Sequence, residues 1–218
     1  PFSILLRGCS FSILYQAGVV AALQHLSPNL LKSASKVYGA SSGAILGAAA
    51  LCECDIGKGR WRLSLLNLLG NSRWFHLVGK NGTKSLRNHL NKHLPMNAHQ
   101  LVSGKLHVII TRVRDCRSVT ISEFTSKEDL IQAILCSCYV PLWLGIFPPV
   151  YRGVRYIDGE IGMWRADFTS RTMITISAFA GEYDICPRDG SAAFFTFQLS
   201  DCILQISKRN LCRLMRIV

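Results

Sequence analysis

The chain has 218 residues, 49% of them hydrophobic, which is enough to bury the core of one α/β domain. Its most apolar stretch, residues 131–150, is broken by a serine and three prolines, so no run of 18 apolar residues could span a bilayer. The formal net charge of +12 suits an anionic partner. No nucleic-acid-binding motif accompanies this charge, and we expect no nucleic acid to bind.

Strands and helices are predicted to alternate from the start of the chain. The expected elements of the first part are a strand at residues 2–6, a helix at 14–26 ended by Pro28, a strand at 36–38 and an apolar helix at 44–51. Residues 57–82 are the least patterned, with one amphipathic turn set formed by Trp61, Leu65, Leu66 and Leu69. No signal peptide is expected, because residues 1–7 lack a basic n-region and a cleavage site.

The second part of the chain continues this alternation. The expected elements are a strand at residues 106–113, a helix at 129–138 opened by a capping box from Ser126 to Asp129, and strands at 154–157 and 173–177. This order favours an α/β fold with a mostly parallel central sheet and helices on both faces. We expect one domain over residues 1–177 and a C-terminal extension over 178–218, truncated, that packs on it.

Two further features concern the surface and the compartment. Residues 202–216 have helical amphipathic spacing, which indicates either an ordinary surface helix or a helix at a lipid interface. The nine cysteines are scattered and include two C-x-C pairs, not the C-x-x-C repeats of zinc sites. We therefore expect a reducing intracellular compartment, with most cysteines packed as small core residues.

The segment Gly39-Ala40-Ser41-Ser42-Gly43 has the G-x-S-x-G spacing of a nucleophile elbow. It lies between a β-prone run and an apolar helix, which is the strand–turn–helix context that the motif requires. Gly39 and Gly43 leave room for a tight turn that projects the hydroxyl of Ser41. The helix that follows directs its amides at a developing oxyanion. The alternative is a Gly/Ser-rich turn without chemistry.

The general base for Ser41 is predicted to be a carboxylate. None of the six histidines follows Asp158, which excludes a triad in the order Ser, Asp, His with Asp158 as its acid. The histidines from His76 to His107 could still reach Ser41 in space, but none lies in a recognisable catalytic motif. Asp158 and Gly159 end a β-prone run, where α/β folds usually place their chemistry. Partial burial would raise the pKa of Asp158 and let it take the serine proton directly. The alternative is a turn-initiating Asp-Gly pair.

His89 and His93 are four residues apart on an expected helix. Two histidines on one helix face could bind zinc, but the glutamate of H-E-x-x-H and a third ligand are missing. A solvated helix face is the preferred interpretation, and we expect neither a metal nor an organic cofactor.

Over nearly its whole length the chain resembles the patatin-like phospholipase domain family, in the animal branch that contains adiponutrin and adipose triglyceride lipase. The resemblance rests on residues 39–43, 104–107, 123–127, 136–141, 151–159 and 184–187. Residues 15–18 and 122–128 are most similar to the epidermal members that make acylceramides. The resemblance implies a three-layer patatin-like fold and a Ser41–Asp158 dyad. It also implies acyl transfer from lipid esters to water or to an alcohol.

In this family a glycine-rich G-x-G-x-x-G loop after the first strand supplies the oxyanion hole, which the resemblance places at Gly8, Cys9 and Ser10. Only Gly8 is retained, since Ser10 and Ile13 stand at the other two glycine positions. Backbone amides can still serve as donors, but serine in a left-handed conformation costs about 1 kcal/mol or more.

Glu160 stands where the family usually has glycine or alanine, and its charge is expected to raise the pKa of Asp158 and to crowd the site. The resemblance therefore leaves two functions open. One is a hydrolase or transacylase that acts on lipid esters: it uses triacylglycerol or phospholipid, or it forms acylceramide by acyl transfer. The other is a weakened or silent lipid-binding protein of the same fold. In both cases the expected partners are a lipid substrate and a lipid-droplet or membrane surface in the cytoplasm.

Overall fold

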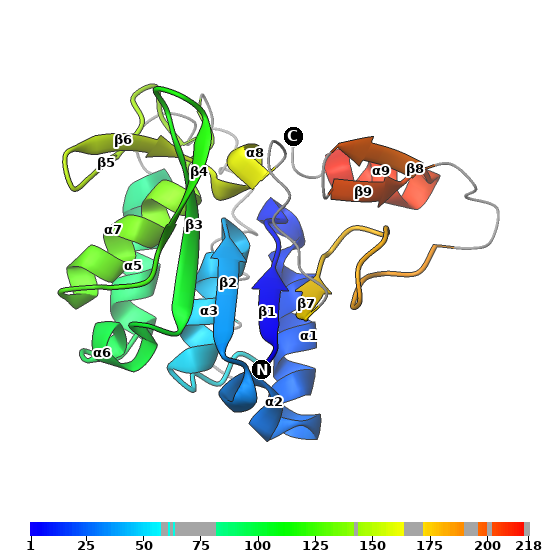
Figure 1. Ribbon diagram of the computed structural model, residues 1–218, viewed down its shortest axis with the longest axis horizontal. Coiled ribbons are helices and arrows are strands. Elements are labelled where there is room, and N and C mark those ends of the chain that lie inside the picture. Colours follow the sequence, from blue (N-terminus) through cyan, green and yellow to red (C-terminus); the bar gives the residue numbers. More distant parts are fainter. Residues whose placement is uncertain are drawn as a thin grey trace.

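The computed structural model describes residues 1–57, 61, 63, 82–141, 144–163, 172–189, 196–199 and 202–215. A seven-stranded sheet forms its centre (Figure 1). Parallel pairing joins four strands in the order β7 (Met173–Ile176), β1 (Ser3–Leu6), β2 (Lys36–Ala40) and β3 (Leu106–Arg112). Antiparallel strands join at β3, namely β4 (Arg117–Ile121) and the hairpin of β5 (Val150–Tyr151) and β6 (Val154–Ile157).

Alternate residues of the central strands face two separate cores, as the period of two in a strand requires. Ile4 and Leu6 belong to the larger core, whereas Leu5 between them belongs to the smaller one. Most described helices pack on the larger core: α1 (Ile13–Leu26), α2 (Pro28–Ser33), α3 (Ser42–Leu51), α5 (Gly82–His93), α6 (Ala98–Val102) and α7 (Lys127–Ser137). The short helix α8 (Gly159–Met163) packs on the smaller core through Met163. The predicted α/β class with helices on both faces is confirmed.

Local sequence signals account for most element boundaries. The side chain of Ser126 accepts a hydrogen bond from the amide of Asp129 at 3.1 Å, so the predicted cap of α7 is confirmed. Pro28 follows α1 as predicted, and it also begins α2, where its missing N–H costs nothing. The amphipathic turn set predicted at residues 61–69 falls largely outside the described residues.

The single helix predicted over residues 202–216 is wrong. Cys202–Gln205 form strand β9, which pairs with β8 (Thr196–Leu199), and only Lys208–Met215 form a helix, α9. The apolar run 202–204 is β-compatible, and its partner strand is invisible to helical periodicity. α9 is tied down by buried Asn210, which bonds both the amide and the carbonyl of Ala180. This contact favours a helix packed on the protein.

No described helix is both long and apolar enough to cross a membrane. All nine cysteines are free, and four of them, Cys9, Cys136, Cys138 and Cys202, are buried. Buried free cysteines behave as small hydrophobic residues, in keeping with the packing role predicted for them.

Candidate active site

Ser41 lies in the tight turn between β2 and α3, with φ 53° and ψ −125°. A non-glycine residue in this region is strained, and such strain is typical of functional sites. The motif glycines allow the turn to pack: a Cβ on Gly43 would lie 2.0 Å from the carbonyl oxygen of Leu6, and a Cβ on Gly39 would lie 2.6 Å from the backbone of Ala44. The strand–turn–helix context predicted for the elbow is confirmed.

A buried serine on α7 supports the strained turn. The Ser137 hydroxyl accepts a hydrogen bond from the amide of Ser41 at 2.8 Å and donates one to the carbonyl of Ile109 at 2.6 Å. Ser137 therefore ties the elbow to strand β3. The chain positions its nucleophile candidate through three elements: β2, β3 and α7.

Strand pairing explains why Ser41 and Asp158 meet. β4 occupies one edge of β3 along residues 108–112. β2 pairs with residues 106–109 of β3 and β6 with residues 111–112, and both stretches overlap the part that β4 covers. β2 and β6 must therefore both lie along the other edge of β3. β2 ends opposite Ile109, whereas β6 runs in the opposite direction and ends opposite Thr111. The two strands thus end head to head, and the chain leaves them at Ser41 and Asp158.

The Asp158 carboxyl is buried, and it lies near enough to the Ser41 hydroxyl for that group to lower its pKa. Its Oδ1 also accepts the amide of Glu160 at 2.9 Å. The backbone of Asp158 is held by the hydroxyl of Thr111, which donates to its carbonyl at 2.6 Å, and by the carbonyl of Tyr139, which accepts its amide at 2.8 Å. The two predicted residues are brought together, while their catalytic roles stay predictions.

Burial raises the pKa of Asp158 to about 7, from an ordinary value of 3.8. The nearby Ser41 hydroxyl and the hydrogen bond from the Glu160 amide act against this rise, and the negative charge of Glu160 adds to it. A carboxyl with a pKa near neutrality is suited to accept a proton and to return it. The Cys138 thiol also lies near the Ser41 hydroxyl, and burial raises the pKa of this thiol well above its usual range.

Gly159, the third predicted motif glycine, sits between the two strand ends. A Cβ there would lie 2.2 Å from the carbonyl oxygen of Ile109 and 3.3 Å from the Cβ of Ala40. Any side chain at this position would push the loop that carries Asp158 away from the elbow. Glycine at position 159 is therefore a steric requirement of the site.

The predicted oxyanion loop runs beside the elbow, between β1 and the 3₁₀ turn Ser10–Ser12. The amide of Cys9 donates to the hydroxyl of Ser42 at 2.9 Å. The amide of Gly8 donates to Glu160 Oε1 at 2.6 Å. Ser10 has φ 44°, the left-handed region expected for its position. The loop lies where predicted, but two of its three amides already have acceptors within the protein.

Glu160 is held on its other side by Arg7, whose Nη2 donates to Oε2 at 2.8 Å. Burial by itself lowers the pKa of Arg7, but the paired carboxylate outweighs this effect and the pKa is raised. The predicted effect of Glu160 on the pKa of Asp158 is confirmed. The Arg7–Glu160 pair itself was beyond sequence reasoning, because the two residues are 153 positions apart.

The histidine pair on α5 differs from its prediction. His89 is buried against Trp61, with ring centroids 5.4 Å apart, so a fully solvated helix face is wrong. The reason is helical periodicity: His89 shares the inward stripe with Leu86 and Leu90. The described residues contain no cluster of three potential metal ligands around it or elsewhere.

A pocket of about 430 Å³ opens between α5, α7 and the loop 144–149. Its lining combines apolar side chains with two cationic ones, and includes Leu135, Tyr139, Leu144, Ile146, Phe147, Lys84 and Arg87. Tyr139 links the pocket to the site, because its carbonyl accepts the amide of Asp158. Its hydroxyl is buried and has no hydrogen-bond partner among the described residues.

Three supporting residues escaped sequence reasoning: Arg7, Ser42 and Ser137. Each acts on the site through a contact with a residue distant in the chain, so no local pattern marks it. Ser42 was visible only as the variable position of the elbow motif. Ser137 lies in a segment that resembles the family, but nothing in that segment indicates the hydrogen bond to Ser41.

The chain that carries this site is similar to known proteins. Residues 4–163 match the family described as patatin-like phospholipase. The omega-hydroxyceramide transacylase of Homo sapiens is 42% identical over 98% of this chain and 41% of its own length. The 1-acylglycerol-3-phosphate O-acyltransferase Pnpla3 of Mus musculus is 36% identical over 99% of this chain and 52% of its own. Patatin-like phospholipase domain-containing protein 2 of Rattus norvegicus is 36% identical over 98% and 45%. The chain thus spans about half of these relatives or less.

Proposed function

Because the chain belongs to the patatin-like phospholipase family, we propose that it is a serine-dependent lipid acyl hydrolase or transacylase acting through Ser41 and Asp158. One observation carries the proposal: a strained, buried serine at a strand–helix turn lies beside a buried carboxyl whose pKa it affects. The turn context supports a nucleophile, and the raised pKa of Asp158 supports a base.

The reaction divides into two acyl transfers. Ser41 Oγ attacks the carbonyl carbon of a lipid ester while Asp158 takes the proton of that hydroxyl. The tetrahedral intermediate then collapses and releases an alcohol, which carries this proton away. Water or an acceptor alcohol then attacks the carbonyl carbon of the acyl-serine while Asp158 takes its proton. The bond from this carbon to Ser41 Oγ breaks, the fatty acid or new ester leaves, and Asp158 returns the proton to Oγ. Hydrolysis and transacylation differ only in that acceptor, and no metal or organic cofactor takes part.

The substrate is proposed to be a lipid ester. The names of the similar proteins point to acyl transfer to a hydroxyceramide in one case and to a lysophosphatidate in another. The pocket beside Tyr139 supports an acyl chain through its apolar wall, and Lys84 and Arg87 at its edge suit an anionic head group.

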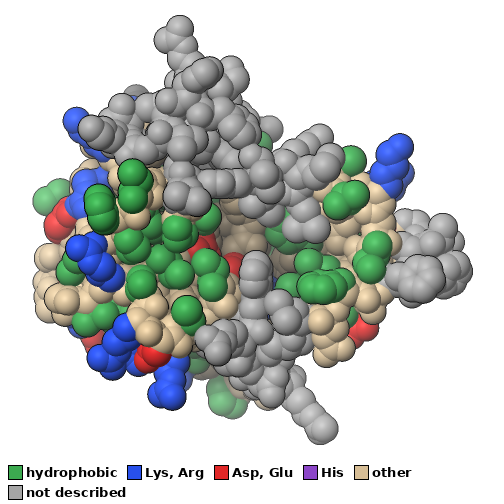
Figure 2. Space-filling model, turned by 90° about the horizontal axis from the view of Figure 1, so that it is seen from above, with side chains coloured by type: hydrophobic (Ala, Val, Ile, Leu, Met, Phe, Trp, Pro, Cys, Tyr) green, Lys and Arg blue, Asp and Glu red, His purple; other side chains and the backbone are tan. Residues whose placement is uncertain are grey.

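An exposed apolar surface next to the site is proposed to dock on an anionic lipid surface, such as a membrane or lipid droplet in the cytoplasm. Ile146, Phe147 and Val150 are 73%, 78% and 45% exposed. Arg155 lies among them and donates to the carbonyl of Pro148 at 2.7 Å. The view onto the strand ends shows a hydrophobic patch edged by Lys and Arg side chains (Figure 2). Apolar side chains with cations beside them match a lipid surface with negative head groups.

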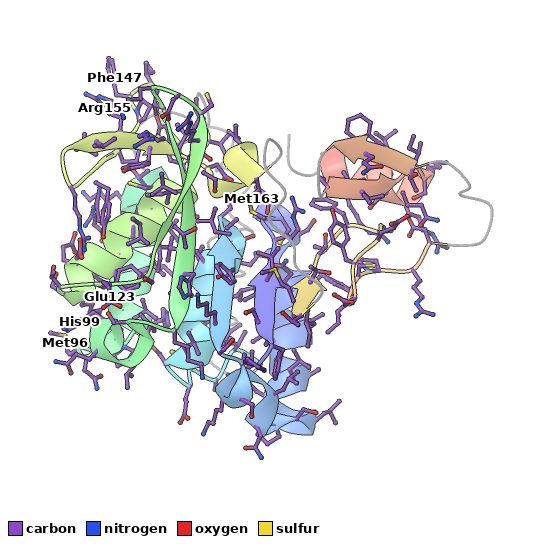
Figure 3. All side chains as sticks on the ribbon, in the orientation of Figure 1. Met96, His99, Glu123, Phe147, Arg155 and Met163 are labelled. Carbon is purple, nitrogen blue, oxygen red and sulfur yellow. The ribbon has the colours of Figure 1, made fainter. Side chains whose placement is uncertain are left out.

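A matched pair of exposed apolar residues tests this docking. Phe147 lies at the upper edge of the protein and Met96 well below it on the same side (Figure 3), and Met96 is 82% exposed. Phe147→Asp should weaken binding to phosphatidylcholine vesicles that contain an anionic lipid at least severalfold, whereas Met96→Asp should leave it unchanged. Equal binding by both variants would place the lipid-binding surface elsewhere.

Labelling with a fluorophosphonate ester tests the catalytic proposal directly, because this probe phosphonylates an activated serine. We expect labelling of the wild-type protein, loss of labelling in Ser41→Ala, and a large decrease in Asp158→Asn. Ser27→Ala is the matched control, since Ser27 is exposed and its side chain makes no capping bond. Folded protein that labels equally well without the Ser41 hydroxyl would refute the assignment of the nucleophile.

The alternative is a catalytically silent lipid-binding protein of the same fold. It is favoured by the contact of Glu160 with the Gly8 amide, which uses a donor that catalysis needs. Side-by-side assays with triacylglycerol, phospholipid and hydroxyceramide donor–acceptor pairs separate the two functions. Vesicle binding without acyl transfer on any pair would support the silent protein.

A further inference from the structure

The side chain of Glu160 fills the space between the glycine loop and the nucleophile. A Cβ on Gly8 would lie 2.5 Å from Glu160 Cγ and 3.0 Å from the Cβ of Ser41. The Glu160 side chain and the nucleophile therefore converge on the same side of Gly8. Glu160 projects from the first turn of α8, two residues after the base, and its position is set by the same strand end that places Asp158.

The contacts of this carboxylate are those of an anion in an oxyanion hole. Oε1 accepts the Gly8 amide at 2.6 Å, a short distance typical of charge-assisted hydrogen bonds. Oε2 accepts from Arg7 Nη2 at 2.8 Å, and Arg7 is 2% exposed. A developing oxyanion on a substrate bound to Ser41 would need the same Gly8 donor.

We infer that Glu160 is an internal occupant of the oxyanion hole and thereby the residue that limits the rate of acyl transfer in this chain. The inference rests on the proposed function, since it takes Ser41 as nucleophile and the Gly8 amide as oxyanion donor. The carboxylate is tethered, so it competes with every substrate at a high effective concentration. The Arg7 pair stabilises the occupied state further, because separating a buried ion pair leaves a charge in a poorly solvated place.

Removing the occupant should release the donor. Glu160→Ala takes away both carboxylate oxygens while keeping a residue compatible with the helix α8. Losing one oxyanion donor in a serine hydrolase costs about 10²–10³ in rate, so regaining the Gly8 amide should raise the fluorophosphonate labelling rate by about 10²-fold. A gain below twofold would overturn the inference.

The charge of Glu160 also acts on Asp158, and Glu160→Gln separates this effect from occupancy. Glutamine removes the charge but keeps a side-chain oxygen in reach of the Gly8 amide. If occupancy limits the rate, Glu160→Gln should stay close to the wild type while Glu160→Ala labels faster. Equal acceleration by both variants would assign the effect to the charge beside Asp158 and would also overturn the inference.

Two controls complete the experiment. Glu160→Ala deprives the buried Arg7 of its carboxylate, so Arg7→Ala/Glu160→Ala is made in parallel to remove both partners, and it should also label faster. Glu123→Ala is the matched acidic control: Glu123 is exposed and lies at the end of the protein near Met96 and His99 (Figure 3). It should label at the wild-type rate.

The outcomes distinguish this inference from the proposed function. Equal labelling of Ser41 in the wild type and in Glu160→Ala refutes the occupant and leaves the nucleophile in place. Absence of labelling in every folded variant refutes the proposed function and the inference with it. Acceleration in Glu160→Ala that disappears in Ser41→Ala/Glu160→Ala supports both.

Discussion

The nucleophile elbow and the oxyanion loop lie side by side, and they differ in what satisfies their polar groups. The elbow amide of Ser41 is bonded to the Ser137 hydroxyl, a contact that leaves the Ser41 side chain free to face Asp158. The loop amide of Gly8 is bonded to the Glu160 carboxylate, an anion placed where a reaction would place its own. Under the proposed function, one half of the site is preorganised for chemistry and the other half is preorganised around an internal ligand.

In terms of the proposed function, this difference means that the catalytic pair and the donors of the oxyanion hole are positioned by separate contacts. The elbow depends on close backbone packing at Gly43 and Gly159, where a single added carbon would meet a carbonyl oxygen. The loop depends on backbone amides that can accept any suitable anion. Two residues outside the elbow, Arg7 and Glu160, provide the contacts that occupy the Gly8 amide. Three measurements test how independent the two halves are.

The largest effect is expected from pH, through the elbow's base. Asp158 must be ionised to accept the serine proton, and its pKa is about 7. The labelling rate should therefore rise as pH increases through about 7 and fall about tenfold for each pH unit below it. Because the charge of Glu160 contributes to the raised pKa, Glu160→Gln should move the midpoint to lower pH. The measurements are made at constant ionic strength. A labelling rate that does not change between about pH 5 and 8 would exclude Asp158 as the base.

A smaller effect is expected from Ser137→Ala, which removes the hydroxyl that joins the elbow to strand β3. The change leaves the Ser41 amide and the Ile109 carbonyl without their buried partner and should lower the free energy of unfolding by about 1–3 kcal/mol. Urea denaturation measures this loss, and the labelling rate should fall with it. Alanine at Ser118 is the control, because the buried Ser118 hydroxyl has no hydrogen-bond partner among the described residues. Equal losses in the two variants would mean that the hydrogen bonds of Ser137 contribute nothing specific.

The smallest effect is expected from Ser10→Gly in the loop. Ser10 has φ 44°, and glycine should relieve about 1 kcal/mol of backbone strain and raise esterase turnover. Glu53→Gly is the matched control, since Glu53 has φ 55° at the far end of α3 from Ser41. It should alter stability without changing turnover. Lower turnover in Ser10→Gly would show that the serine side chain helps to hold the loop.

Much of the fold was predictable because its signals are local. The elbow at Ser41, the cap at Ser126 and the strand ending at Asp158 each depend on a few adjacent residues, and the structure places all three as expected. The β9 strand was missed because its apolar residues fit a helix or a strand equally well until a partner strand is known. His89 was placed in solvent because its helix face was judged without the core that covers it.

The amino-acid sequence by itself determined the α/β class, the elbow and the identity of the acidic residue that follows β6, since these depend on residue type and short-range spacing. Only the tertiary structure decided that β2 and β6 end head to head along one edge of β3, which brings Ser41 to Asp158. It also decided that Glu160 meets Gly8 rather than solvent. The physical reason is that a hydrogen bond needs its two groups within about 3 Å, and residues 152 positions apart reach that distance only through the sheet that joins them.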